Sequence, residues 1–262
     1  MNDPVLAVIP ARLGSSRLAR KPLHPILGKP LLQWVWERVA PMEVFHRVVV
    51  ATESEEVRGL CNKLGAPCVL TDPGHPSGTD RVAEVVEREE YRSYDIVANV
   101  QGDEPLVQEA HLARAVALVR DAGWEVGTCA TPLVDPEARR DPSVVKVAMG
   151  TEGRALYFSR AGIPYKREGK PTEAELAAPP FLRHLGIYVY RRQALARWVA
   201  LSPSPLEELE RLEQLRALEH GIPVGVAVVE NAGPGVDTAA DVIRMEEVLS
   251  RQANASTLTH RT

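Results

Sequence analysis

Four basic residues follow the first predicted strand, in the segment from residue 10 to residue 22. They are Arg12, Arg17, Arg20 and Lys21, and Gly14, Ser15 and Ser16 lie among them. Guanidinium and ammonium groups neutralise phosphate, and glycine lets backbone N–H groups approach it. A plain exposed basic loop is the alternative, but open α/β sheets bind ligands where strands end, which favours a phosphate site. The segment contains neither the G-x-G-x-x-G dinucleotide motif nor the Walker motif, which argues against a dehydrogenase.

Two aspartates lie in turns that follow other predicted strands. Asp103 stands in the segment 99–105, and Asp237 stands in the segment 233–238. Asp103 could hold Mg²⁺ beside a triphosphate, because that ion prefers oxygen ligands, and Asp237 could have a functional role. The local alternatives are an Asx turn at Asp103 and a glycine turn before a helix cap at Asp237. If both hold one ion, they should repel each other without it, so asparagine at either position should barely lower the melting temperature.

Two more segments carry candidate binding residues. In Ser77–Arg81, small residues could let a base or a ribose approach the backbone, or could simply cap a helix. Phe181–Gly186 sets Arg183 and His184 beside a strand, where a structural histidine is the alternative to a functional one. The residues alone leave both readings open.

The elements that position these segments alternate between strands and helices through the first ~130 residues. Unbroken apolar runs predict strands covered on both faces, at 5–9, 47–52 and 96–101. The patterns between them predict helices at 30–39 with Pro30 at N1, at 55–64 after a Thr52–Glu55 capping box, at 79–90 capped by Thr79, and at 108–122. This order predicts a doubly wound α/β sheet.

The second half of the chain does not continue this regular alternation of strands and helices. It predicts a hairpin of strands 144–149 and 155–159, a loop at 162–180, strands at 182–191 and 224–229, a helix from Ser204 to about Glu219, and a helix capped by Thr238 and Asp241 that ends near Leu249. We therefore expect one α/β domain over residues 1–250, with a β-rich insertion at about 140–190. Residues 251–262 are polar and aperiodic, which predicts a flexible tail.

The composition narrows the class of protein. The chain has 262 residues, 45% hydrophobic and 25% charged, with a net charge of −4, which is ordinary for a globular protein and argues against wholesale nucleic-acid or membrane binding. Three cysteines without metal-ligand spacing indicate reduced thiols. The N-terminus lacks a secretory signal and no apolar run is long enough for a membrane span, so we expect a cytoplasmic protein.

Taken together, the five segments resemble the 3-deoxy-manno-octulosonate (Kdo) cytidylyltransferases, which make CMP-Kdo for lipopolysaccharide. The resemblance covers nearly the whole chain, and further matching stretches are 145–147, 155–164, 181–188, 204–207 and 212–216. It implies a Rossmann-like α/β nucleotidyltransferase fold, CTP and Mg²⁺, and a homodimer built partly by Val144–Arg160. One departure is that the family usually reads Arg-Leu-Pro-Gly-Lys where this chain has Ala19 and Arg20 before Lys21.

The resemblance also implies residue roles. The triphosphate would be bound by Arg12, Arg17 and Lys21, and the metal by Asp103 and Asp237. The nucleotide would contact Ser77, Gly78, Arg81 and Gln101. The sugar acid would contact Arg160, His184, Tyr188, Glu213 and Gln214, with Arg160 expected to bind its carboxylate.

Other activities remain open at this point. A cytidylyltransferase for 8-amino-Kdo or a sialic acid would use the same chemistry. A sugar-1-phosphate nucleotidyltransferase is more distant, and often uses UTP or dTTP. A non-catalytic nucleotide-binding regulator would not need both Asp103 and Asp237.

Overall fold

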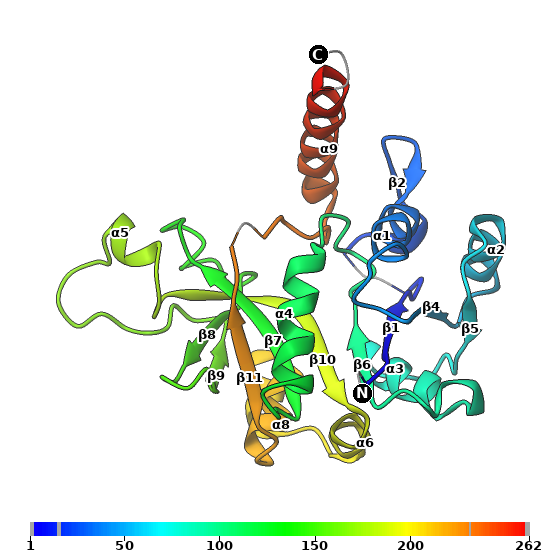
Figure 1. Cartoon of the computed structure of the whole chain (residues 1–262). Coiled ribbons are helices and arrows are strands. Elements are labelled where there is room, and N and C mark those ends of the chain that lie inside the picture. The colour runs from blue at the N-terminus through cyan, green and yellow to red at the C-terminus, as the bar shows by residue number, and fades with distance from the viewer. Residues whose placement is uncertain (1–2, 15–16, 231, 260–262) are drawn as a thin grey trace.

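The computed structural model of the chain describes residues 3–14, 17–230 and 232–259. Ser15 and Ser16 of the basic loop, and residues 260–262 of the predicted tail, lie outside the described residues. Figure 1 shows a broad twisted sheet with helices on both sides, and a long C-terminal helix that extends away from it.

The main sheet explains why several segments distant in sequence meet at one edge. The strand order is β11-β7-β10-β6-β1-β4-β5, with β8 and β9 attached through β10. The strands are β1 (Val5–Pro10), β4 (Arg47–Thr52), β5 (Cys68–Leu70), β6 (Ile96–Asn99), β7 (Val126–Pro132), β8 (Lys146–Met149), β9 (Ala155–Ser159), β10 (Leu182–Arg191) and β11 (Val224–Val228). β1 pairs in parallel with both β4 and β6, so these three strands end on the same side. A separate two-stranded sheet joins β2 (Pro25–Ile26) to β3 (Lys29–Pro30).

Helices cover both faces of this sheet, as the unbroken apolar strands predict. Ala7 and Ile9 pack with α1 (Leu31–Val39), α2 (Glu55–Leu64) and α4 (Glu109–Arg120). Leu6 and Val8, which point to the other face, share a core with α3 (Gly78–Glu87), α6 (Arg192–Ala200) and α8 (Gln214–Glu219). The prediction of a doubly wound α/β fold is therefore confirmed.

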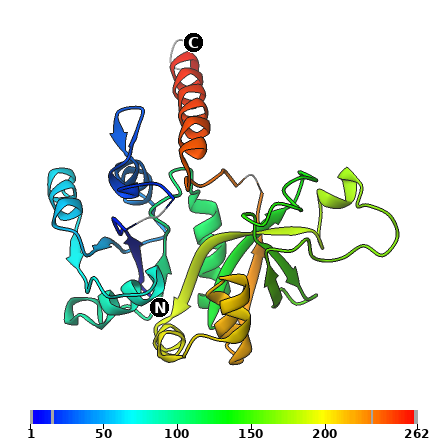
Figure 2. The same cartoon turned by 180° about the vertical axis from the view of Figure 1, so that it is seen from behind.

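The β-rich part contains the predicted hairpin of β8 and β9, which hydrogen-bond as antiparallel neighbours. β10 runs antiparallel to β6 and β7, so it ties this hairpin to the parallel strands. Figure 2, from behind, shows the hairpin and the long connection after β9 at the opposite side of the molecule from α2. That connection is irregular apart from one short helix, α5 (Glu173–Leu176), which the loop prediction missed.

Two of the predicted helix caps are wrong by two residues. α2 is capped by Ser54, whose Oγ accepts a hydrogen bond from the Val57 N–H, while Thr52 still belongs to β4. α3 is capped by Ser77 rather than Thr79, because Ser77 Oγ accepts from two backbone N–H groups of the first turn. Short 3₁₀ turns, η1 (Lys21–Leu23) and η2 (Glu89–Tyr91), complete this half of the chain.

The helix predicted from Ser204 to Glu219 is broken in two. α7 (Pro205–Glu210) ends at Arg211, which has a left-handed backbone with φ of 53°, and α8 begins at Gln214. The two pieces are joined by Arg216, whose Nε and a terminal nitrogen each donate to one Glu207 carboxylate oxygen at 2.6 Å. The break turns the chain so that residues 211–214 face the site described below.

The last helix is longer than predicted. α9 spans Ala239–Thr259, so the expected end near Leu249 is wrong, while the flexibility expected of residues 251–262 stays a prediction. Residues 250–259 contain neither glycine nor proline, and nothing in them stops a helix that has already formed. Its first half packs on Leu18, Ile26 and Leu31 through Val242, Met245 and Leu249.

In the described residues no helix has both the length and the apolar content that a membrane span requires.

Candidate active site

Two adjoining cavities open where β1 and β6 end. One has a volume of about 470 Å³ and the other about 260 Å³. Both are lined by Arg17, Gln101, Asp103, Glu213 and Asp237. The smaller one lies against the basic loop and is called the phosphate-side cavity; the larger one lies against β10 and α8 and is called the sugar-side cavity.

The phosphate-side cavity collects the cations and the small residues that the sequence singled out. Its lining includes Arg12, Arg17, Lys21, Ser77, Gly78 and Arg81. The turn after β6 lies directly against the end of β1: a Cβ on Gly102 would come within 2.8 Å of the Pro10 carbonyl oxygen, so only glycine fits there. This close contact brings Asp103 beside the basic loop.

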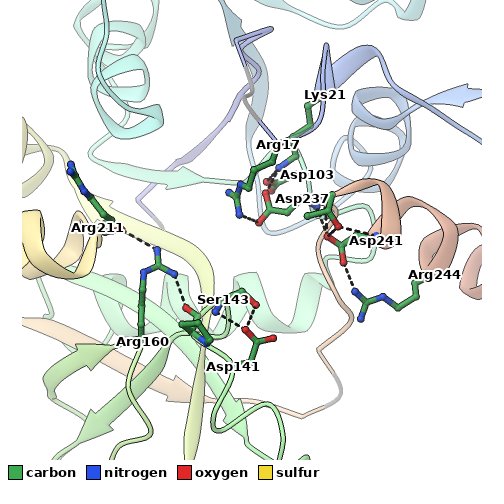
Figure 3. A network of polar contacts seen from close by, with 12 residues as sticks. Arg17, Lys21, Asp103, Asp141, Ser143, Arg160, Arg211, Asp237, Asp241 and Arg244 are labelled. Atoms are coloured by element: carbon green, nitrogen blue, oxygen red, sulfur yellow. Dashed lines mark hydrogen bonds and ion pairs between the residues drawn. The ribbon is translucent and has the colours of Figure 1, made fainter.

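Asp103 and Asp237 meet although 134 positions separate them in the chain (237 − 103). Lys21 joins them: its Nζ donates to Asp103 Oδ2 and, at 2.7 Å, to Asp237 Oδ1. The other Asp237 oxygen lies 3.1 Å from an Arg17 nitrogen. Figure 3 shows these four side chains converging from three separate segments. The expected repulsion between the two carboxylates is thus offset by an ammonium group between them, and the small effect expected on the melting temperature stays a prediction.

The donor set suits Mg²⁺. Two carboxylates that meet through Lys21, next to cations that can bind phosphates, match an ion that usually takes one or two carboxylates plus phosphate oxygens and water. Among the described residues no cluster of three or more His, Cys, Asp or Glu side chains could hold a metal alone. Such an ion would therefore share its coordination with the triphosphate.

Arg81, one of the predicted nucleotide contacts, is held by Glu53, which the sequence did not single out. Glu53 Oε1 accepts from the Leu13 N–H at 2.9 Å, and Oε2 lies 2.9 Å from an Arg81 nitrogen. Arg81 is 2% exposed and also donates to Thr71 Oγ1. Glu53 thus fixes the basic loop relative to α3. Its position directly after β4 is the feature from which the sequence could have identified it as a site residue, because open α/β sheets bind ligands where their strands end.

His184 and Tyr188 face the sugar-side cavity from β10. A bulge between residues 185 and 188 shifts the register of the strand, and the two rings lie 5.3 Å apart. Burial lowers the pKa of His184 to about 3. Thr128 Oγ1 donates to the Ile187 carbonyl at 2.6 Å, so His184 Nε2 donates to Thr128 Oγ1 at 2.9 Å and Nδ1 is left as an acceptor. The ring is therefore neutral and suited to accept a hydrogen bond from a hydroxyl group.

Three further polar side chains line this cavity, and they differ in whether they already have a hydrogen-bond partner. Tyr188 Oη is buried and has no hydrogen-bond partner among the described residues. Glu213 accepts from Thr79 Oγ1 at 3.0 Å, and burial raises the pKa of its carboxyl. Gln214 is buried beside it and lines the same cavity. An orphaned hydroxyl and two carbonyl-type groups match a polyhydroxylated ligand better than an apolar one.

Arg160 does not line either cavity. Its guanidinium donates to the carbonyl oxygens of Glu210 (2.6 Å), Pro142 (2.8 Å) and Arg211 (3.2 Å). Figure 3 shows it between Arg211 and the segment that contains Asp141 and Ser143. Its expected contact with a sugar carboxylate stays a prediction, and in this structure its role is to hold three backbone segments together.

Three charged residues of the sugar-side cavity were missed as site candidates, and one of them is Arg211, at the break between α7 and α8. Glu104, next to Asp103, lines it, and burial together with the Asp103 charge raises the pKa of its carboxyl to about 7. Arg183, singled out only as a neighbour of His184, also lines it and donates to the Ala232 carbonyl at 2.6 Å. In the sequence, the only sign that Glu104 and Arg183 belong to the site is that they stand next to Asp103 and His184.

Comparison with known proteins agrees with this geometry. The family model described as cytidylyltransferase matches residues 6–255. The 3-deoxy-manno-octulosonate cytidylyltransferase of Gemmatimonas aurantiaca is 48% identical over 241 residues, 92% of each chain. That of Chromohalobacter salexigens is 46% identical and covers 98% of this chain and 100% of its own. A solved structure of CMP:2-keto-3-deoxy-manno-octonic acid synthetase complexed with CTP superposes with a TM-score of 0.85, at 36% identity, covering 95% of this chain and 99% of the other. The chain therefore belongs to the cytidylyltransferase family.

Proposed function

We propose that this enzyme transfers CMP from CTP to the anomeric hydroxyl of Kdo, giving CMP-Kdo and pyrophosphate, and so activates Kdo for lipopolysaccharide synthesis. The observation that carries the proposal is the junction of the two cavities at Asp103 and Asp237. A cation-lined cavity for a triphosphate opens there into a polar cavity for a hydroxylated acid. The similarity to Kdo cytidylyltransferases over nearly the full length supports the same pair of substrates.

The reaction joins the sugar hydroxyl to the α-phosphorus and releases pyrophosphate in line. The protein has little covalent work to do, so catalysis comes from positioning and charge neutralisation. Arg12, Arg17 and Lys21 line the side from which the pyrophosphate leaves, and their charges stabilise the negative charge that develops on it. His184 Nδ1 and Tyr188 Oη orient sugar hydroxyls, and with its low pKa His184 is an acceptor rather than a general base.

We propose Mg²⁺ as the cofactor, held by Asp103 and Asp237. When bound, it would supply Lewis-acid stabilisation of the phosphate charge. In this structure the Lys21 ammonium group contacts the same two carboxylates and offsets one of their two negative charges. Lys21 is then free to bind phosphate once the carboxylates have another cation.

We also propose a cytoplasmic homodimer. The free thiols Cys61, Cys68 and Cys129 suit a reducing compartment. The dimer proposal is supported by the β8–β9 hairpin and the adjacent α7, which expose Leu156 (61%) and Leu209 (80%). Light scattering coupled to size-exclusion chromatography tests it: a mass near the 28.7 kDa of one chain would refute it.

The decisive experiment measures pyrophosphate release with a panel of nucleotides and acidic sugars. We expect turnover with CTP and Kdo, in the presence of Mg²⁺. Preferred turnover of 8-amino-Kdo or a sialic acid would reassign the sugar while keeping the chemistry. Turnover of a sugar 1-phosphate, or none with any pair, would refute the proposal.

A further inference from the structure

Lys146 is a lysine with no access to solvent. It lies in β8, its exposed fraction is 0%, and neither the phosphate loop nor the metal-binding pair includes it. Its Nζ donates to the carbonyl oxygens of Asp141 (2.9 Å), Val144 and Arg160 (2.7 Å). Three N–H donors thus meet three carbonyl acceptors, so the ammonium group is fully satisfied.

The charge of Lys146 has no direct counterion. No carboxylate among the described residues lies within ion-pair distance of Nζ, and burial lowers the pKa of the ammonium group. Burying a cation costs free energy, whereas an apolar side chain of the same length would fill the space without that cost. What only the ammonium group provides is a single point to which three backbone carbonyls are fixed.

Two of those carbonyls belong to a segment that builds the sugar-side wall. Asp141 and Val144 lie in the segment 141–145, whose residues 143–145 line the sugar-side cavity. The Val145 carbonyl in turn accepts from the His184 N–H at 2.8 Å. The wall that faces His184 is therefore attached to the hairpin through Lys146.

The third carbonyl leads to the other side of the same cavity. Arg160, held through its carbonyl by Lys146, donates its backbone N–H to Glu210 Oε2 at 2.8 Å and its guanidinium to the carbonyls of Glu210 and Arg211. Arg211 lies at the break between α7 and α8, two residues before Glu213. Through Arg160, Lys146 thus connects both walls of the sugar-side cavity.

The connected walls belong almost entirely to the sugar-side cavity. Val144, whose carbonyl Lys146 binds, and Arg211, whose carbonyl Arg160 binds, line that cavity and not the phosphate-side one. Of the wall residues 143–145 and 211–214, Glu213 alone also lines the phosphate-side cavity. From this asymmetry we infer that Lys146 is a positioning residue for the sugar acid and not for the nucleotide. The inference rests on the proposed function, because it assigns Lys146 to the Kdo half of that reaction.

The experiment compares Lys146→Met with Val147→Ala. Val147 is the next residue of β8, is also 0% exposed, packs in the apolar core and is among the lining residues of neither cavity. Steady-state kinetics with CTP and Kdo varied in turn should give Lys146→Met a KM for Kdo raised roughly 10- to 100-fold, since a wall displaced by about 1 Å has effects of this size. Its KM for CTP should stay within about twofold of the unmodified enzyme. Val147→Ala should lose thermal stability with both KM values nearly unchanged.

A second variant covers the case in which Lys146→Met does not fold. Lys146→Arg keeps the charge, but a planar guanidinium cannot place three donors around one point, so it should raise the KM for Kdo in the same direction by a smaller factor. An unchanged ratio of the two KM values in the folded variant would overturn the inference. So would a change in both KM values that follows the loss of melting temperature as in Val147→Ala.

A substrate-independent measurement separates this inference from the proposed function. Hydrogen exchange of the amides of residues 143–145 should accelerate in the folded Lys146 variant and not in Val147→Ala. If the unmodified enzyme does not use Kdo, the proposed function fails, and this exchange result still decides whether Lys146 holds the wall. Unchanged exchange there refutes the positioning role.

Discussion

Replacing either carboxylate of the Asp103–Asp237 pair should nearly abolish turnover. The two side chains lie within hydrogen-bond distance of one Lys21 nitrogen, so a single ion can bind both of them. Losing one ligand should remove most of what that ion contributes to the transition state, about 3–5 kcal/mol, or roughly 10²- to 10⁴-fold in kcat. Asp103→Asn and Asp237→Asn should each show this loss.

The double variant distinguishes a shared ion from two independent roles. Groups that act as a unit are not additive, so Asp103→Asn combined with Asp237→Asn should be no slower than either single variant within about threefold. Two independent contributions would multiply instead, and the double variant would lose roughly 10⁴-fold or more. Turnover is measured against Mg²⁺ concentration for all three variants. Near-normal activity of Asp237→Asn would refute its role as a metal ligand and leave it with only the structural role of a turn before a helix.

Each single variant should lower the melting temperature slightly, whereas simple repulsion between the two carboxylates would raise it on substitution. Lys21 is 14% exposed and the carboxylates 31% and 44%, so each ion pair is partly solvated and contributes about 1 kcal/mol or less. For a chain of this size that corresponds to a fall of about 2–4 °C in melting temperature for each single variant. A rise in melting temperature on asparagine substitution would show that repulsion outweighs the Lys21 contacts and would refute this reading of the pair.

Three further predictions follow from the site. His184→Ala should raise the KM for Kdo and leave CTP affinity by calorimetry nearly unchanged; an equal loss of CTP affinity would assign His184 to the nucleotide or the fold. Because burial lowers the pKa of His184 from 6.5 to about 3, its neutral form contributes stability that is complete above pH 6.5 and is lost as the pH falls towards 3. Between pH 7 and pH 5 the unmodified protein should therefore lose about 2 kcal/mol more unfolding free energy in urea than His184→Gln, and equal losses would contradict the shift. Lys21→Met should bind Mn²⁺ without nucleotide about tenfold more tightly than the unmodified protein in an electron paramagnetic resonance titration, since two carboxylates lose their internal cation; unchanged or weaker binding would contradict this.

The parts of the site that sequence predicts are those that follow from strand order. Parallel strands end at one edge, so the basic loop after β1 and Asp103 after β6 had to lie close together. The unbroken apolar runs of the strands predicted that helices cover both faces of the sheet. These inferences use only backbone direction and residue type, and they need no knowledge of how side chains pack.

Predictions that depend on a side chain's direction fared differently. Arg160 carries a guanidinium that sequence can only describe as a cation near a strand, and in the fold its donors go to three carbonyls from two other segments. Glu53 carries a carboxylate in a segment that also caps a helix, and its contacts with Leu13 and Arg81 lie 40 and 28 positions away (53 − 13 and 81 − 53). In both cases the role is set by neighbours that are remote in sequence.

The break between α7 and α8 shows the same principle acting on the backbone. Residues 204–219 contain no glycine, and their only proline is at the first turn, so local propensity predicts one continuous helix. The chain nevertheless places Arg211 in the left-handed region, which costs a non-glycine residue of the order of 1 kcal/mol. The buried Glu207–Arg216 pair and the packing of Leu212 and Leu215 in the core offset that cost. A straight helix would separate these contacts, and it would carry Glu213 away from the cavity that it lines beside Asp103.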